Sequence, residues 1–263
     1  MEFFTRFRYF SGMRNQRVLE PESMMGKEDV AAYDAIVRKH LEILHYGFVE
    51  TIVNCSPATG RFLDVGAGTG WISIGVAEHN PNAEIHAFDL SEDMLSVAAE
   101  NAEKHGVRDR IVFAKADAKR LPFPDGSFDA VFSHNMMHHL PDPKVMLAEM
   151  KRVAKPKGGF FLRDLKRVND FWRGFYVKVF GFNYDELMKR EYNDSIRAAF
   201  SENEWRELYD WLDLRGANLV KKWVTHMGIE RPAEQVIDRP VKVATPLFAR
   251  FAKNLYVTPP TNN

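Results

Sequence analysis

The chain has 263 residues, of which 45% are hydrophobic, enough to build one large α/β domain with additions. Its 36 Lys and Arg residues balance its 36 Asp and Glu residues, so we expect no nucleic-acid partner and no membrane partner held by charge. Cys55 is the only cysteine, which excludes a disulfide framework and a Cys-based metal cluster and is typical of a cytoplasmic protein.

Residues 1–55 predict an N-terminal arm followed by a helix, acting as a lid or a packing element. Pro21 and Gly26 break regular structure in the first 26 residues. From residue 28 to residue 52, apolar side chains recur at helical spacing. The arginine-aromatic start of the arm could serve as a lid, as a contact of a homodimer, or stay disordered.

Residues 56–230 predict a single α/β domain. Strand-like runs are expected at 62–65, 84–88, 110–114, 128–132 and 159–162, and helices at 71–78, 91–104 and 143–154. This alternation predicts a Rossmann-like, doubly wound, mostly parallel sheet with helices on both faces. Such sheets bind ligands beyond the carboxyl ends of their strands, where the strand order reverses.

The sequence changes character after the fifth expected strand. Residues 166–200 are rich in aromatic side chains and predict an insertion that covers a substrate. Ser201 and Glu204 form a capping-box pattern that opens a helix. One late strand is expected at 218–224, and residues 231–263 form an extension without a clear pattern.

The stretch LDVGAGTG places three glycines, Gly66, Gly68 and Gly70, directly after the first strand. Alone, such spacing is also compatible with a simple tight turn that needs positive φ angles. The preceding Asp64 adds information, because a pyrophosphate at a helix start would avoid a nearby carboxylate. A ligand that carries an ammonium group would favour one.

Two more strand ends carry carboxylates. Asp89 ends the second strand, where a carboxylate can accept hydrogen bonds from both ribose hydroxyls, although it could also cap the next helix. Asp117 and Ala118 follow the third strand, where a side-chain acceptor beside a backbone N–H can bind the amino edge of adenine. Adenine, ribose and a cationic amino-acid tail together describe S-adenosylmethionine.

Four stretches follow one another within residues 61–165, namely LDVGAGTG, IHAFDLS, AKADAKRLPF and FDAVFSHNMMHHL. In these stretches the chain resembles the class I S-adenosylmethionine-dependent methyltransferases, most closely the small-molecule branch of ubiquinone and menaquinone biosynthesis. The resemblance implies in-line transfer of a methyl group to a small organic acceptor, with S-adenosylhomocysteine as the product.

The resemblance also implies roles for individual residues. The implied cofactor-binding residues are Asp64, Gly66, Gly68, Gly70, Asp89, Leu90, Asp117, Ala118, Ser133 and His134. The acceptor side is implied at His139, Arg163 and Asp164, with packing as the alternative for the histidine and a structural ion pair as the alternative for the other two. We expect the acceptor to lie between these three residues and the aromatic segment 171–192.

Three alternatives to this function were weighed. An NAD-dependent oxidoreductase is disfavoured, because Trp71 interrupts the dinucleotide fingerprint. An RNA or protein methyltransferase, and a catalytically silent partner subunit that binds S-adenosylmethionine, remain open. No metal is expected, since Ser133-His134-Asn135 stands where metal-dependent relatives carry clustered carboxylates.

Overall fold

The computed structural model describes most of the chain. The described residues are 16–20, 26–44, 46–182, 184–222, 224–237, 241 and 243. The first part of the expected N-terminal arm and most of the expected C-terminal extension lie outside these residues.

A seven-stranded sheet in the order β3-β2-β1-β4-β5-β7-β6 forms the centre of the fold. The strands are β1 Thr59–Val65, β2 Asn82–Asp89, β3 Ile111–Lys115, β4 Phe128–His134, β5 Ala154–Leu165, β6 Asn218–Lys222 and β7 His226–Arg231. Strands β1 to β5 pair in parallel, and β7 pairs antiparallel with both β5 and β6. The predicted Rossmann-like α/β fold is therefore confirmed.

The prediction of a single late strand was wrong, because β7 follows β6 directly. The sequence of β7 includes the charged residues Glu230 and Arg231, which are not typical of a buried strand. Both side chains are nevertheless buried. Glu230 lies 3.2 Å from the guanidinium of Arg163, and Arg231 donates to the carbonyl groups of Gly158 and Lys155. Buried charges with partners are tolerated in a sheet interior.

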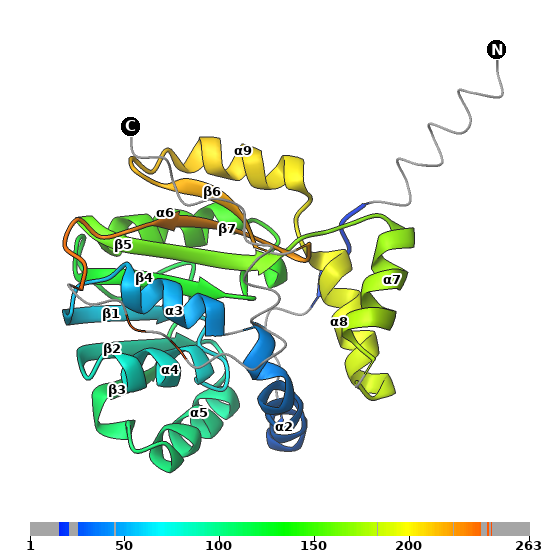
Figure 1. Cartoon of the computed structure of the whole chain (residues 1–263), viewed down its shortest axis with the longest axis horizontal. Coiled ribbons are helices and arrows are strands. Elements are labelled where there is room, and N and C mark those ends of the chain that lie inside the picture. Colours follow the sequence, from blue (N-terminus) through cyan, green and yellow to red (C-terminus); the bar gives the residue numbers. More distant parts are fainter. Residues whose placement is uncertain are drawn as a thin grey trace.

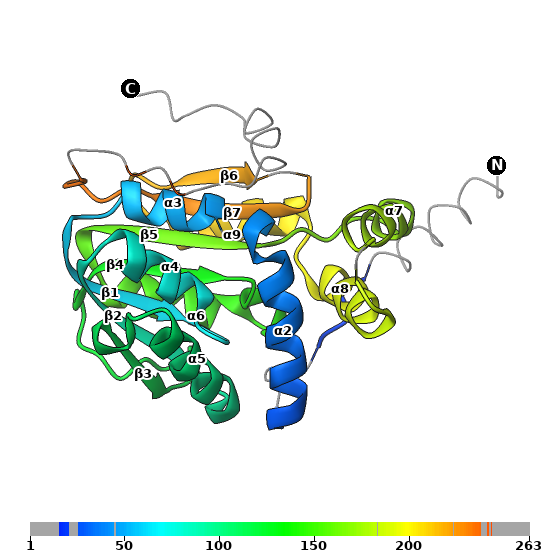
Figure 2. The ribbon, with the colours of Figure 1, turned by 60° about the horizontal axis from the view of Figure 1, so that its bottom comes forward.

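Helices cover both faces of the sheet (Figures 1 and 2). The helices are α2 Lys27–Leu44, α3 Tyr46–Asn54, α4 Trp71–His79, α5 Glu92–Lys104, α6 Pro143–Val153, α7 Asp170–Phe180, α8 Glu186–Ala198 and α9 Glu202–Leu212. Helices α3, α4 and α5 lie on one face, and α6 and α9 on the other. Each face has its own cluster of buried apolar side chains.

Local signals in the sequence account for several helix starts. Ser91 caps α5 by accepting a hydrogen bond from Met94 N, and Ser201 with Glu204 forms the predicted capping box of α9. Both caps satisfy N–H groups that would otherwise lack a partner at a helix start. The helix expected from residue 28 to residue 52 is divided into α2 and α3.

The carboxyl ends of the parallel strands meet at one edge of the sheet, and three helices gather there. Helices α7 and α8 extend beyond this edge, and α2 runs across it (Figure 2). Asp34 of α2 accepts hydrogen bonds from Trp71 Nε1 at 2.8 Å and from Asn101 Nδ2 at 3.0 Å. Because β1 has β2 on one side and β4 on the other, the strand order reverses at β1, where a ligand crevice is expected.

Candidate active site

The three loop glycines are required for different reasons. All three have positive φ, namely 76° at Gly66, 53° at Gly68 and 85° at Gly70. A Cβ atom on Gly66 would collide with Met136, and one on Gly70 would lie 2.9 Å from the Cβ of Ala98. A Cβ on Gly68 would meet no described atom within 4 Å. Packing therefore explains Gly66 and Gly70, and Gly68 is the glycine that faces open space.

Asp89 braces the glycine loop. Its Oδ2 accepts a hydrogen bond from Gly68 N at 2.9 Å, and its Oδ1 accepts one from Ser91 N at 2.9 Å. Burial raises the pKa of Asp89, and the hydrogen bonds from these backbone N–H groups act in the opposite direction. Because Ser91 and not Asp89 caps α5, the carboxylate of Asp89 stays beside the glycine loop.

Asp64 lies buried among protein groups, with 1% of its surface exposed. Its Oδ2 accepts a hydrogen bond from Ser73 Oγ at 2.7 Å. Burial raises the pKa of Asp64 to about 7. The carboxyl group therefore changes its charge near neutral pH, where a neighbouring cation would favour the ionised form.

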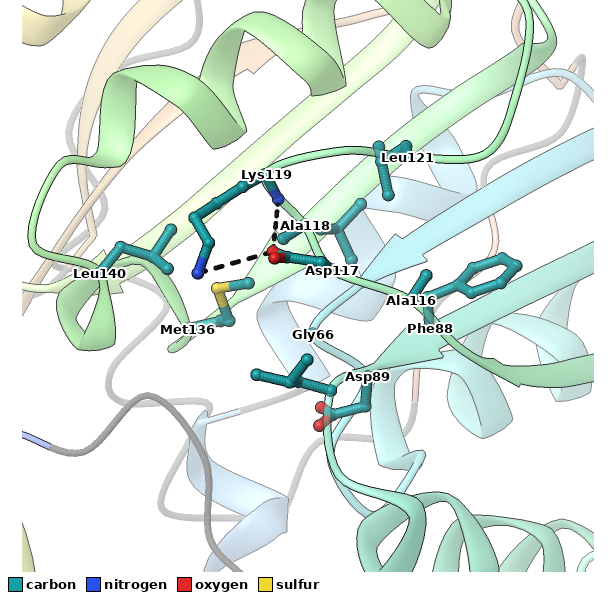
Figure 3. Close-up of a pocket in the computed structure, with 12 residues that line it drawn as sticks. Gly66, Phe88, Asp89, Ala116, Asp117, Ala118, Lys119, Leu121, Met136 and Leu140 are labelled. Carbon is teal, nitrogen blue, oxygen red and sulfur yellow. Dashed lines mark hydrogen bonds and ion pairs between the residues drawn. The ribbon is translucent and has the colours of Figure 1, made fainter.

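An open cleft with a volume of about 40 Å³ lies at the carboxyl ends of β1, β2, β3 and β4. Figure 3 shows Asp89 and Asp117 on opposite sides of it. Its lining residues are Val65, Gly66, Phe88, Asp89, Leu90, Ala116, Asp117, Ala118, Lys119, Leu121, Met136 and Leu140. Five residues that the sequence singled out lie in this lining: Gly66, Asp89, Leu90, Asp117 and Ala118. Apolar walls between two carboxylates suit a flat base attached to a polar sugar.

Asp117 shapes the far side of the cleft. Its Oδ1 accepts a hydrogen bond from Lys119 N at 2.9 Å, and Lys119 Nζ lies 3.6 Å away (Figure 3). The carboxylate thus stabilises the turn after β3 while its side chain stays partly exposed at the cleft. An aspartate that bonds to the backbone two residues later is a common turn feature.

Ser133 and His134 were expected beside the donor's sulfur, and neither residue is among those that line the cleft. The buried Ser133 Oγ donates to Val65 O at 2.6 Å. The ring of His134 lies 5.0 Å from Phe48 and 6.1 Å from His226, measured between centroids. Successive side chains of a strand point to opposite faces, so these two residues cannot face the same ligand from β4.

Arg163 and Asp164 likewise point to opposite faces, here of β5. Arg163 lies 3.2 Å from Glu230 and 4.6 Å from the ring centre of Phe48. Asp164 instead accepts a hydrogen bond from His138 Nδ1 at 2.6 Å, and its Oδ2 accepts one from His138 N at 3.0 Å. The geometry of Arg163 matches the structural ion pair, whereas Asp164 belongs to a buried polar cluster.

His138 was not predicted from the sequence as a site residue; the neighbouring His139 was predicted instead. Only 3% of His138 is exposed. Burial acts to lower its pKa, but the carboxylate of Asp164 outweighs this effect and raises the pKa of His138 above its ordinary value. The sequence marks both histidines just after the fourth strand, and only the fold shows which one meets Asp164.

The described part of the N-terminal arm reaches this cluster. Arg17 donates to the carbonyl groups of His138 and Leu140, both at 2.7 Å, and its guanidinium stacks 3.9 Å above the ring of Phe200. Glu20 Oε2 lies 3.5 Å from His139 Nδ1 and 3.7 Å from His138 Nε2. Residues 16–20 are thus held against the turn that follows β4.

Tyrosine side chains occur on α2 and α8 and in the loop before α8. Burial raises the pKa of Tyr33 on α2 to about 12, and the charge of Asp89 adds to the effect. Tyr184 and Tyr192 stack edge to face, with ring centres 5.8 Å apart. Burial also raises the pKa of both hydroxyls.

The aromatic segment 171–192, which was expected to cover the acceptor, is divided between α7, the loop after it and α8. On α7, the side chains of Phe171, Trp172 and Phe175 are exposed, and Tyr176 is buried. Tyr176 donates to Val224 O at 3.3 Å. Helix α7 therefore directs several aromatic side chains to solvent.

Comparison with known proteins identifies the family. A family model described as a methyltransferase domain matches residues 58–216. The chain is 38% identical over 193 residues to malonyl-[acyl-carrier protein] O-methyltransferase of Geobacter sulfurreducens, covering 70% of this chain and 69% of that protein. It is 40% identical over 101 residues to demethylmenaquinone methyltransferase of Thermus thermophilus, covering 38% and 45%. The chain belongs to the class I S-adenosylmethionine-dependent methyltransferases.

A solved structure supports the fold. The chain superimposes on a SAM-dependent methyltransferase from Aquifex aeolicus with a TM-score of 0.59 and 21% identity, covering 79% of this chain and 98% of the other. The chain spans about half the length of several curated relatives that it matches. Among the helices that the structure describes, none combines the length and the apolar character needed to cross a bilayer.

Proposed function

We propose that the chain binds S-adenosylmethionine in the cleft and transfers its methyl group to a small organic acceptor. The observation that carries the proposal is the cleft itself, which lies at the strand-order reversal with Gly68 facing open space and with Asp89 and Asp117 on opposite sides. Adenine fits the apolar wall between these carboxylates, and Asp89 would accept hydrogen bonds from the ribose.

The amino-acid tail of the donor would lie over the glycine loop. Asp64 beneath the loop supplies negative charge for the ammonium group, directly or through water. The donor supplies an electrophilic methyl group, whose bond to sulfur breaks as the acceptor attacks in line. The protein mainly has to align the partners and exclude water, and such positioning can contribute up to ~7–11 kcal/mol.

The acceptor would enter on the side of the Asp164–His138 pair and the tyrosines. Tyr33, Tyr184 and Tyr192 combine aromatic surface with hydroxyl groups, which suits an acceptor that has an apolar ring or chain and a polar end. The two relatives named above are named for demethylmenaquinone and for malonyl-[acyl-carrier protein], so similar chains carry the names of different acceptors.

Transfer of a labelled methyl group tests this proposal. Purified full-length chain is incubated with S-adenosylmethionine that carries a radioactive methyl group and with a panel of quinols, phenols and carboxylic acids. We expect label in at least one small acceptor, with S-adenosylhomocysteine formed in equal amount. Label in added tRNA or protein would favour a macromolecular acceptor, and donor binding without any transfer would favour the silent partner subunit.

A further inference from the structure

Three potential metal ligands converge next to the donor cleft, from two distant parts of the chain. They are Glu20 from the N-terminal arm and the adjacent His138 and His139 from the turn after β4. One ligand atom from each side chain lies within 4.8 Å of the others. We propose that Glu20, His138 and His139 form a binding site for a divalent cation of the zinc class.

The distances suit a cation better than a hydrogen bond. Glu20 Oε2 lies 3.5 Å from His139 Nδ1 and 3.7 Å from His138 Nε2. Hydrogen bonds between nitrogen and oxygen are usually about 2.7–3.2 Å long. Ligand atoms about 2.1 Å from a tetrahedral zinc ion are about 3.4 Å apart. Small rotations of Glu20 and of the partly exposed His139 would therefore complete the triangle.

Asp164 orients His138 for this role. The carboxylate accepts from His138 Nδ1 at 2.6 Å, so Nδ1 carries a proton, and Nε2 on the side of Glu20 would bind a cation in exchange for any proton that it holds. Metal-bound histidines commonly donate their other N–H group to a carboxylate in this way, which fixes the ring and strengthens the ligand. Asp164 is itself fixed by hydrogen bonds from His138 N and Leu165 N.

Glu20 is also held in place. Ser195 Oγ on α8 donates to both of its carboxylate oxygens, at 3.2 and 3.3 Å. Arg17 attaches the same arm segment to the turn through its hydrogen bonds to the carbonyl groups of His138 and Leu140. The carboxylates of the partly buried Glu20 and of the buried Asp164 lie beside the ligand atoms and favour a cation, whereas the nearby guanidinium of Arg17 opposes one.

The position suggests what the cation would do. The turn that carries the histidines also supplies Met136 and Leu140 to the lining of the donor cleft. Three protein ligands leave one position of a four-coordinate cation open, as in catalytic zinc sites. If the proposed function holds, this position would receive an oxygen of the acceptor, which points to a hydroxyl or carboxylate acceptor. From the sequence, His134, His138 and His139 suggested a metal, but packing was the preferred interpretation, because no convergent set of ligands was visible without Glu20 from the arm.

Titration of the chelator-treated full-length chain with zinc chloride tests the site, and cobalt(II) supplies a second readout through its visible absorption. We expect one ion per chain and the absorption of tetrahedral cobalt. Glu20→Gln and His138→Ala should each weaken binding by more than about tenfold, and Asp164→Asn by about 10–100-fold. Glu186→Gln and His105→Ala, which change the same residue types far from the cluster, should bind the cation as wild type does.

The outcomes separate this inference from the proposed function. Absence of stoichiometric zinc binding, or wild-type affinity in Glu20→Gln and His138→Ala, would overturn the cation site. If these variants do not fold, His139→Ala decides the matter, because this side chain is one-third exposed. S-adenosylhomocysteine is titrated into the same preparations: donor binding without zinc binding removes only the cation site, and failure of donor binding removes the function.

Discussion

The proposed donor half and the proposed acceptor half of the site are built in different ways. On the donor side, Asp64, Gly68, Asp89 and Asp117 stand at the ends of successive strands or in the loops that follow them. On the acceptor side, Glu20 contacts His138 and Ser195, and His138 in turn bonds to Asp164; these residues belong to separate segments of the chain. Strand topology alone therefore brings the donor-side residues together, whereas the acceptor-side residues come together only through the packing of the arm and α8.

The largest expected effect is on the donor half. Gly68→Val should weaken S-adenosylhomocysteine binding by more than about 100-fold, since the side chain would occupy the open space where the ligand approaches. Gly106→Val is the matched control, because Gly106 also has positive φ, 67°, and a Cβ there would also meet no described atom within 4 Å. Both variants should lose similar stability, about 1–2 kcal/mol or more. If calorimetry finds similar donor affinity for the two variants, the loop is a structural turn and not a part of the donor site.

A second prediction concerns Arg163, which we now assign to the structure and not to the acceptor. Arg163→Met should lower the free energy of unfolding by about 2–3 kcal/mol, because it leaves the buried Glu230 with fewer partners. Urea unfolding measures this loss. Turnover per folded molecule and S-adenosylhomocysteine affinity should stay at the wild-type level. A stable variant with reduced turnover would return Arg163 to the acceptor site.

Asp89 provides a smaller test of the donor half. Asp89→Asn should weaken S-adenosylhomocysteine binding by about 1–2 kcal/mol, or about 5–30-fold, since the amide keeps the shape of the carboxylate and loses its charge. An analogue of the ligand without ribose hydroxyls should bind to wild type and variant almost equally. Equal losses for both ligands would mean that Asp89 acts only by bracing Gly68.

Asp64 gives the smallest effect, a pH dependence. Burial raises the pKa of Asp64 to about 7, and an ammonium group nearby would favour the ionised form. S-adenosylhomocysteine affinity should therefore rise a few-fold from pH 6 to pH 8, with proton release at pH 6. In the free protein the sign is opposite: stability falls as pH rises from about 4 to 7, because the unfolded chain has already lost this proton. Calorimetry should find a flatter pH profile for Asp64→Asn.

The same contrast explains how much could be predicted from sequence. The parallel strands were predicted correctly because short apolar runs, such as Phe62–Val65, are followed directly by recognisable loop motifs. Strand β7 was not predicted because it contains charged residues, and only the fold brings their buried partners close to them. Arg163 and Asp164 were expected together, yet alternation along β5 separates them. The contact between Glu20 and His138 joins residues far apart in sequence, and no local sequence pattern predicts it.

The most direct test of the central claim is a calorimetric titration of the full-length chain with S-adenosylhomocysteine and, separately, with NAD. The cleft between Asp89 and Asp117 predicts one S-adenosylhomocysteine per chain and NAD binding at least about 100-fold weaker, because a pyrophosphate would be repelled by the carboxylate of Asp64 beside the glycine loop. NAD binding that equals or exceeds S-adenosylhomocysteine binding would contradict the account.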